Sequence, residues 1–343
     1  MFVRNNKKAT LTVVFTVLLV VLCIALAAIF KELGTKSTTS NLQTQSATQT
    51  VTESIVGPQL DTNKQYGNKY ANGLLPVGDK KVTTQAKKGY VFSCQTNFVS
   101  ESQAGAQVRG PWFVNNNTQW DINKKTTVSG SINWDNNLTM AIVNDKRTIT
   151  TNDLPDHHTG TFPVAKTDPA YNYDRNPNTI KSQSLTYTLT ESPSYGNPQC
   201  MGNEAGVMTS GSALFNAFDA GGRDAGAWEV QDSCDGHPQV SGEYHYHTLS
   251  RCVTDVSVQT VIGYALDGFA ITGPKLSDQN ILTTDDLDEC HGIVSEIMLD
   301  GKKTKTYHYV MTQDFPYSVS CFRATPTKSA GAQAGSPPQS RRP

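Results

Sequence analysis

Apolar and polar residues alternate with a period of two along several stretches of the chain between residues 128 and 262. Such a period places successive side chains on opposite faces of a β-strand, and clusters of Gly, Pro and Asn separate the stretches. The pattern predicts an all-β fold, an antiparallel sandwich or barrel-like ectodomain with few short helices, one of them a turn over residues 213–218. The alternating apolar positions are Val128, Ile132, Trp134, Leu138, Met140, Ile142, Tyr187, Leu189, Val256, Val258 and Ile262.

The N-terminus has a different pattern, with no charged residue over residues 9–30. As a helix this run spans about 33 Å, because each residue adds ~1.5 Å, and a bilayer core is ~30 Å thick. Arg4, Lys7 and Lys8 precede it, and positive residues stay on the cytoplasmic side. We therefore expect residues 1–8 to lie in the cytoplasm and residues 9–30 to form a transmembrane signal anchor, through which the membrane is a partner.

A cleaved signal peptide is the alternative interpretation of this run. Ala25-Leu26-Ala27 has the small-x-small form of a cleavage site. The run is longer than the apolar core of a signal peptide, which has about 7–15 residues, and this length favours the uncleaved anchor. The expected location is the cell membrane, with a single pass and an extracellular ectodomain. After cleavage the domain would instead be secreted.

Two polar segments delimit the expected domain. Residues 31–60 begin with a stretch of Ser, Thr, Gln and Asn that cannot bury enough apolar surface to offset chain entropy, so we expect a flexible linker. Residues 325–343 are rich in Pro, Ser, Ala and Gly and are expected to form a disordered tail. The β ectodomain is therefore expected over residues 61–324.

Charge and motif content exclude several classes of function. Lysine and arginine total 29 and aspartate and glutamate total 30, so the chain lacks the basic surface of a nucleic-acid-binding protein. The sequence has no P-loop, no dinucleotide-binding fingerprint and no G-x-S-x-G elbow. No residue can be assigned a catalytic role from the sequence, and any surface ligand is unknown.

The cysteines of the exported part indicate disulfides. An even number in an exported domain favours three bridges, although six cysteines allow 15 pairings. Local pairing is the simplest, and it joins Cys234 with Cys252 and Cys290 with Cys321, which leaves Cys94 with Cys200 by elimination. The spacings are too wide for zinc knuckles. The six residues are Cys94, Cys200, Cys234, Cys252, Cys290 and Cys321.

The segment Tyr244-His245-Tyr246-His247 carries the main chemical signal. On a strand the two histidines point to one face and the two tyrosines to the other, so both imidazoles reach one ion. His237 lies in a Gly- and Pro-containing turn that can fold it back over this strand. The sequence thus predicts a metal site at His237, His245 and His247, with copper or zinc as the ion. The alternative is a set of structural histidines in a half-buried sheet.

Two further segments contain candidate ligands. Tyr307-His308-Tyr309 repeats part of the His strand, so His308 would join the same site or build a second one, depending on where the two strands lie. Asp156-His157-His158 is another cluster, but adjacent side chains on a strand diverge, so at most one of these histidines would join.

Several motifs in a fixed order resemble the YHYH-domain family of exported proteins, over residues of about 120–324. The family has no settled activity, so the resemblance implies no particular reaction. The segments that carry it are Asp156-His157-His158-Thr159-Gly160-Thr161-Phe162-Pro163, Gly221-Gly222-Arg223-Asp224-Ala225, Gly242-Glu243-Tyr244-His245-Tyr246-His247, the run from Ile262 to Pro274, Asp286-Leu287-Asp288-Glu289-Cys290-His291-Gly292, Tyr307-His308-Tyr309 and Phe315-Pro316-Tyr317.

Three functions agree with these patterns. The first is a surface module that binds a transition metal through histidines. The second is a metal-assisted hydrolase or oxidase, in which Glu243 or Asp267 would act as acid or base. The third is a cell-surface adhesion or carbohydrate-binding domain, with Trp112, Trp120 and Trp134 as the platform and the histidines as structural residues.

Overall fold

The computed structural model describes residues 56–100 and 105–328. The expected cytoplasmic N-terminus, the membrane segment 9–30, most of the expected linker and most of the expected tail lie outside these ranges. Among the described residues, no helix has both the length and the apolar character needed to cross a membrane.

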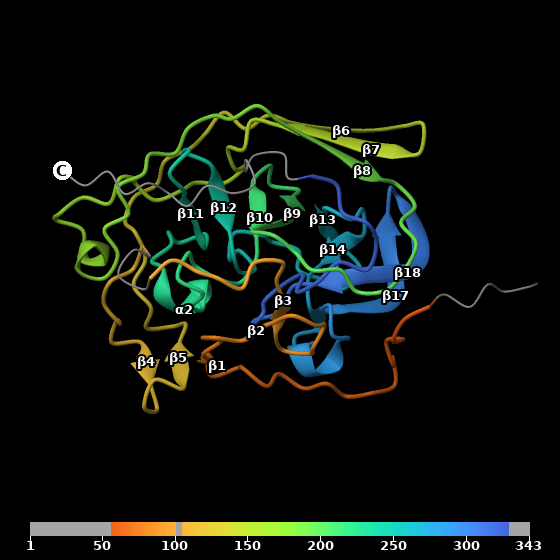
Figure 1. Ribbon diagram of the computed structural model, residues 1–343, viewed down its shortest axis with the longest axis horizontal. Coiled ribbons are helices and arrows are strands. Elements are labelled where there is room, and N and C mark those ends of the chain that lie inside the picture. The colour runs from red at the N-terminus through yellow and green to blue at the C-terminus, as the bar shows by residue number, and fades with distance from the viewer. Residues whose placement is uncertain (1–55, 101–104, 329–343) are drawn as a thin grey trace, which may run out of the picture. The chain divides into compact units, whose positions relative to one another are not determined.

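One mixed eight-stranded sheet forms the centre of the described structure (Figure 1). Its edge strands are β11 and β17, so the sheet is open. Five of its pairings are antiparallel, whereas β10 with β12 and β14 with β18 are parallel. In spatial order the strands are β11 (Gly236–Pro238), β12 (Tyr244–Tyr246), β10 (Ala213–Phe215), β9 (Glu204–Met208), β13 (Val261–Ala265), β14 (Ala270–Thr272), β18 (Lys302–Val310) and β17 (Gly292–Leu299).

Smaller sheets and short helices complete the fold. The described helices are short: α2 (Ala225–Trp228) and the 3₁₀ helices Pro169–Asn172 and Thr284–Asp286. The smaller sheets are β1 (Leu74–Pro76) with β5 (Gln119–Asp121) and β4 (Phe113–Val114); β6 (Leu138–Val143) with β7 (Lys146–Thr151) and β8 (Leu185–Thr190); β2 (Val82–Thr83) with β3 (Val91–Phe92); and β15 (Lys275–Ser277) with β16 (Asn280–Ile281).

The described structure is mostly β with few short helices, as expected, but its sheets do not close into a barrel. The expected antiparallel arrangement is also incomplete because of the two parallel pairs. Alternation is visible in β8, where Leu185, Tyr187 and Leu189 are buried and the intervening threonines are exposed. In the central strands both faces are buried, so no alternation marks them. This explains why residues 213–218, expected as a helical turn, contain strand β10.

Three disulfides staple the fold. They join Cys94 to Cys200, Cys234 to Cys252 and Cys290 to Cys321, which are the pairs that local pairing predicts. Chain pairing also begins before residue 61. The backbone N–H of Leu60 donates to the carbonyl of Val294 at 2.9 Å, and the N–H of Val294 donates to Pro58 at 2.7 Å. The last residues of the expected linker thus lie along β17.

Buried tyrosines fix two turns to the sheet. The Tyr244 hydroxyl donates to both carboxylate oxygens of Asp232 at 3.1 and 3.0 Å, and Tyr307 does the same to Asp288 at 3.1 and 3.2 Å. All four side chains are buried. Because a buried carboxylate is costly unless it is hydrogen-bonded, these contacts hold each turn against its strand.

We predict that Tyr307→Phe lowers the free energy of unfolding by about 1–3 kcal/mol, because it removes a hydrogen bond to a buried charged group and leaves Asp288 with fewer donors. Tyr90→Phe is the matched control. The Tyr90 hydroxyl has no hydrogen bond within the ranges that the structure describes, so this change should stay within about 0.5 kcal/mol. Urea unfolding of the oxidised protein measures both, and equal effects would contradict the assigned role of Tyr307.

Candidate metal centre

The hairpin of β11 and β12 brings the predicted ligands together. His237 on β11 lies directly opposite His245 on β12, and His247 follows two residues later on the same face. His237 was expected in a turn, but it lies on strand β11, and residues 239–243 return the chain to β12. The Cys234–Cys252 disulfide closes the segment that contains both strands, so the hairpin is tied at its base.

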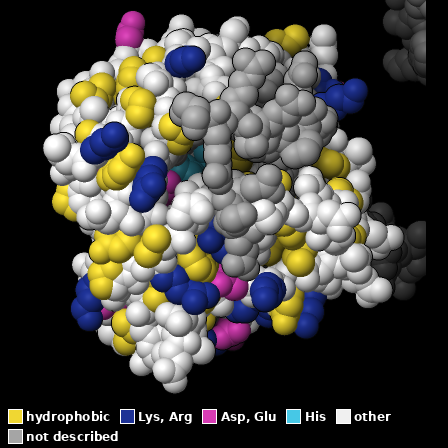
Figure 2. Space-filling view, turned by 60° about the vertical axis from the view of Figure 1, so that its left-hand side comes forward, with side chains coloured by type: hydrophobic (Ala, Val, Ile, Leu, Met, Phe, Trp, Pro, Cys, Tyr) yellow, Lys and Arg dark blue, Asp and Glu magenta, His cyan; other side chains and the backbone are white. Residues whose placement is uncertain are grey.

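The three imidazoles converge in the interior. Each of His237, His245 and His247 exposes only 4% of its surface. One ring nitrogen from each lies within 4.8 Å of the others, and the two Nε2 atoms of His245 and His247 are 3.2 Å apart. Figure 2, which brings this side of the molecule forward, shows only a small area of histidine surface.

Hydrogen bonds orient the rings of β12. His247 Nδ1 lies 2.5 Å from the carbonyl oxygen of Asn216, and His245 Nδ1 lies 3.3 Å from that of Glu243. A carbonyl oxygen only accepts, so a bonded Nδ1 carries the proton and Nε2 keeps its lone pair. Phe215 stacks on the His245 ring with centroids 4.1 Å apart. Such outer contacts are the usual means of fixing a metal-binding imidazole.

A carboxylate completes the cluster, and sequence reasoning missed it. Glu229 follows directly after α2, a single turn whose N-cap Asp224 accepts a hydrogen bond from Ala227. The Glu229 Oε2 atom lies 3.4 Å from His237 Nε2 and 3.3 Å from His247 Nε2, but neither contact is aligned as a hydrogen bond. The available signal was one acid within the apolar run of residues 225–230.

Burial sets the charge state of these groups. It lowers the pKa of His247 to about 4 and lowers the pKa values of His237 and His245 well below the ordinary value. Neighbouring imidazoles add to the effect at His237. Burial also raises the pKa of Glu229 well above its usual range, with help from the Asp219 carboxylate. The histidines are therefore neutral, which is the form that binds metals.

Several buried atoms of the cluster have no protein partner. The two ring nitrogens of His237 form no hydrogen bond with any described residue, and the same holds for Oε2 of Glu229. If Nδ1 of His245 carries the proton, the lone pair of its Nε2 faces the lone pair of His247 Nε2. If Nε2 carries the proton, the lone pair of Nδ1 faces the carbonyl oxygen of Glu243. Native proteins rarely leave buried polar atoms in this state, and a cation among the Nε2 atoms would satisfy all of them except Nδ1 of His237.

His308, the fourth expected ligand, lies apart from this cluster. Its Nδ1 is 3.0 Å from the hydroxyl of Thr272, and its Nε2 is 2.8 Å from that of Ser295. Strand β18 is five neighbours away from β12, a separation of about 24 Å at ~4.8 Å per strand. His308 is thus a buried histidine whose two nitrogens both have partners.

The second His cluster of the sequence also lies elsewhere. His157 Nε2 is 2.6 Å from the Tyr246 hydroxyl, and Tyr246 is on the face of β12 opposite to the three histidines. A nitrogen of His157 and the sulfurs of Cys234 and Cys252 lie within 4.8 Å of one another. Those sulfurs form a disulfide, however, and a metal requires thiolates. His158 contacts the hydroxyl of Ser233 at 3.2 Å.

Residues expected to act in carbohydrate binding or in catalysis are packed in the core or bonded to neighbouring groups. Trp112 and Trp120 are buried in the core, so they cannot form an exposed platform for a sugar. Asp267 accepts from the Tyr309 hydroxyl at 2.7 Å and from the backbone N–H groups of Phe269 and Arg323. Burial raises the pKa of Asp267 to about 6, and these donors oppose the rise.

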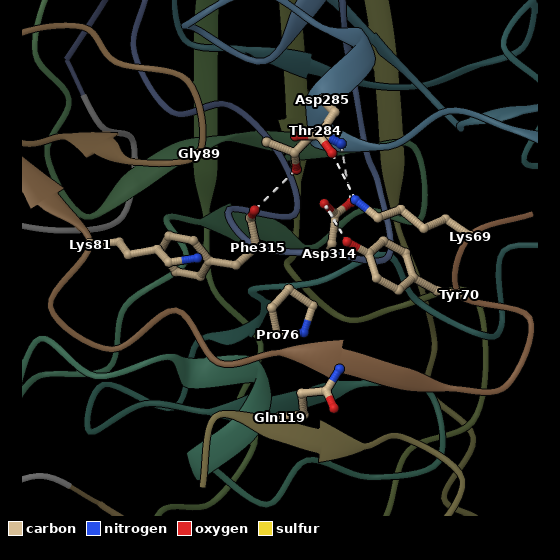
Figure 3. A pocket seen from close by; sticks show the side chains of 10 residues that line it. All are labelled: Lys69, Tyr70, Pro76, Lys81, Gly89, Gln119, Thr284, Asp285, Asp314 and Phe315. Atoms are coloured by element: carbon tan, nitrogen blue, oxygen red, sulfur yellow. Dashed lines mark hydrogen bonds and ion pairs between the residues drawn. The ribbon is translucent and has the colours of Figure 1, made fainter. Parts of the chain in front are cut away.

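Two surface hollows among the described residues lie away from the histidines. One hollow of about 370 Å³ is lined by residues that include Lys69, Tyr70, Asp314 and Phe315, and the Tyr70 hydroxyl donates to Asp314 at 3.3 Å (Figure 3). A second, of about 330 Å³, borders Asp267. None of the three clustered histidines lines either hollow, so neither gives a substrate access to them.

His308 gives a pH prediction. Burial lowers its pKa to about 4, whereas an unfolded histidine titrates near ~6.5. As pH falls between these values, only the unfolded state gains a proton at this site, so its contribution to stability decreases. Relative to His308→Gln, the wild type should lose about 1.4 kcal/mol of unfolding free energy per pH unit from pH ~6.5 to ~4. Urea unfolding at several pH values tests this, and parallel pH profiles would refute it.

Comparison with known proteins agrees with the resemblance seen in the sequence. Residues 163–284 match a family model described as YHYH protein. The match contains the α2 turn and the β11–β12 hairpin, and it ends before β17 and β18. No curated protein and no solved structure matches the chain. On this match, residues 163–284, which include all three clustered histidines and Glu229, form a YHYH domain.

Proposed function

We propose that this domain binds one transition-metal ion, zinc or copper, through His237, His245, His247 and Glu229. The observation that carries the proposal is the convergence of four buried donor atoms, of which His237 Nε2 and Glu229 Oε2 have no hydrogen bond to a described residue. Three neutral imidazoles and one carboxylate are a common donor set for Zn²⁺, and imidazole also suits copper.

The distances between donors support this assignment. With metal–donor bonds of about 2.0–2.1 Å, the donors at the corners of a tetrahedron are roughly 3.3 Å apart. The Nε2 atoms of His245 and His247 are 3.2 Å apart, and Glu229 Oε2 is 3.3 and 3.4 Å from the Nε2 atoms of His247 and His237. Three edges thus have the length that a four-coordinate ion requires.

A buried binding module fits the surroundings better than an enzyme. A catalytic metal keeps one position open to a substrate, whereas these four donors are buried and neither described hollow reaches them. With the expected anchor at residues 9–30, the domain would hold its ion at the outer face of the cell membrane. Retention or sequestration of the ion is the role that this arrangement supports.

The full-length protein, purified without a metal-chelating step, should contain close to one equivalent of zinc or copper by elemental analysis. His245→Ala/His247→Ala should reduce this content to background, because it removes two of the four donors. The matched control is His158→Ala/His308→Ala, two histidines whose contacts lie outside the cluster, and it should retain the ion. Metal-free wild-type protein that takes up no added Zn²⁺ or Cu²⁺ would rule out the proposal.

The role of Glu229 gives a separate prediction. Glu229→Gln keeps the side-chain shape but removes the negative charge, so the affinity for Zn²⁺ should fall at least about tenfold while the stoichiometry at saturation stays at one. Glu243→Gln is the control, because the Glu243 carboxylate already accepts from the Gln239 side chain. Competition with a chelator measures both affinities. Equal affinities of the two variants would remove Glu229 from the donor set.

A further inference from the structure

The strand order of the large sheet is symmetric about its centre. Strands β9 and β13 are neighbours at the centre. Outward from β9 come β10, the parallel strand β12 and the antiparallel edge strand β11, and outward from β13 come β14, the parallel strand β18 and the antiparallel edge strand β17. In chain order β9, β10, β11 and β12 correspond to β13, β14, β17 and β18. We call these four-stranded groups the first unit and the second unit.

The register of pairing obeys the same symmetry. Val207 of β9 and Tyr264 of β13 are paired at the centre of the sheet. Exchanging the two units turns the pair on one side of them, Met208 with Gly263, into the pair on the other side, Ala265 with Gly206. The bulge of β10 against β9 also has a counterpart in β13 against β14. The matched pairs are Val207–Ala213 with Tyr264–Ala270, Gly206–Leu214 with Gly263–Ile271, and Glu204–Phe215 with Val261–Thr272.

The turn before each edge strand provides a second, independent correspondence. In the first unit, Asp232 Oδ1 accepts from the backbone N–H of Cys234 at 2.9 Å and of Gly236 at 3.2 Å, and the Tyr244 hydroxyl contacts both carboxylate oxygens. A Cβ on Gly236 would lie 2.2 Å from the Tyr244 ring, so only glycine fits there.

The second unit reproduces this turn. Asp288 Oδ1 accepts from Cys290 at 3.0 Å and from Gly292 at 2.9 Å, and Tyr307 contacts both oxygens. A Cβ on Gly292 would lie 2.1 Å from the Tyr307 hydroxyl. The sequence pattern Asp-x-Cys-x-Gly is thus shared, and in each unit its cysteine forms a disulfide.

We infer that the sheet is one structural unit occurring twice, and that the second unit contains a latent counterpart of the metal centre. The register defines its positions, because Ile293 faces His308 on β17 and β18 as His237 faces His245 on β11 and β12. The corresponding residues are His237 and Ile293, His245 and His308, and His247 and Val310.

The contacts of His308 show why this counterpart does not bind an ion. Its two possible co-ligands are replaced by apolar side chains, and the hydroxyls of Thr272 and Ser295 occupy both of its nitrogens. Thr272 stands where Phe215 stacks on His245 in the first unit. The second unit therefore uses its histidine for internal hydrogen bonds, whereas the first presents its histidines to an ion. This contrast rests on the proposed function of the first unit.

The test reopens the latent site in the full-length protein. Ile293→His/Ser295→Ala/Val310→His supplies two imidazoles and frees the Nε2 atom of His308. At saturating Zn²⁺, elemental analysis after gel filtration should give two equivalents for this variant and one for the wild type. Adding His308→Ala to the triple variant is the control and should return the content to one.

A second variant, with the converse substitutions in the first unit, tests the inference even if the triple variant does not fold. Phe215→Thr/His237→Ile/Gln239→Ser/His247→Val gives the first unit the residues of the second. It should fold with three disulfides and bind no zinc. An unfolded converse variant, or a folded triple variant with one equivalent, would overturn the equivalence of the units.

The two proposals fail differently in this design. If the wild type and the triple variant each contain one equivalent of zinc, only the latent site is refuted. If the wild type contains no zinc and the triple variant contains one equivalent that is lost on His308→Ala, the proposed function is refuted and the inference is supported. Zero equivalents in both proteins would refute both.

Discussion

Hydrogen bonds from buried tyrosine hydroxyls to buried carboxylates hold this sheet and its turns in one arrangement. Each carboxylate would be costly to bury alone, and each is retained because a hydroxyl and other nearby donors satisfy it. Since both partners are fixed by packing, the bond sets the position of a turn relative to a strand. The pairs are Tyr244 with Asp232, Tyr307 with Asp288 and Tyr309 with Asp267.

The candidate metal centre depends on this constraint through the two faces of β12. Tyr244 and Tyr246 occupy one face and are tied to Asp232 and His157, so the strand cannot shift by one residue without breaking those bonds. The opposite face therefore presents His245 and His247 in a fixed register. A donor set held in this way needs little reorganisation when an ion binds.

The sequence predicted the β class and the grouping of His237 with the His strand, because a two-residue period and a short separation along the chain are local signals, although His237 lies on a strand and not in the expected turn. It could not predict the mixed sheet, since strands buried on both faces, such as β10, have no alternation to read. Glu229 was missed because it reaches the histidines from another element, α2, at no characteristic spacing. His308 has the same local motif as His245, and only its surroundings in the fold distinguish the two.

Strand β11 lies at the edge of the sheet, with three residues paired on one side only. Detaching it breaks the fewest ladder bonds of any strand that carries a ligand, and the bridge between Cys234 and Cys252 limits how far it can swing. For the proposed ion, detachment of β11 would open a route past His237 to the other donors. The same tether favours reclosure, so both the entry and the escape of the proposed ion would be limited by the opening of β11.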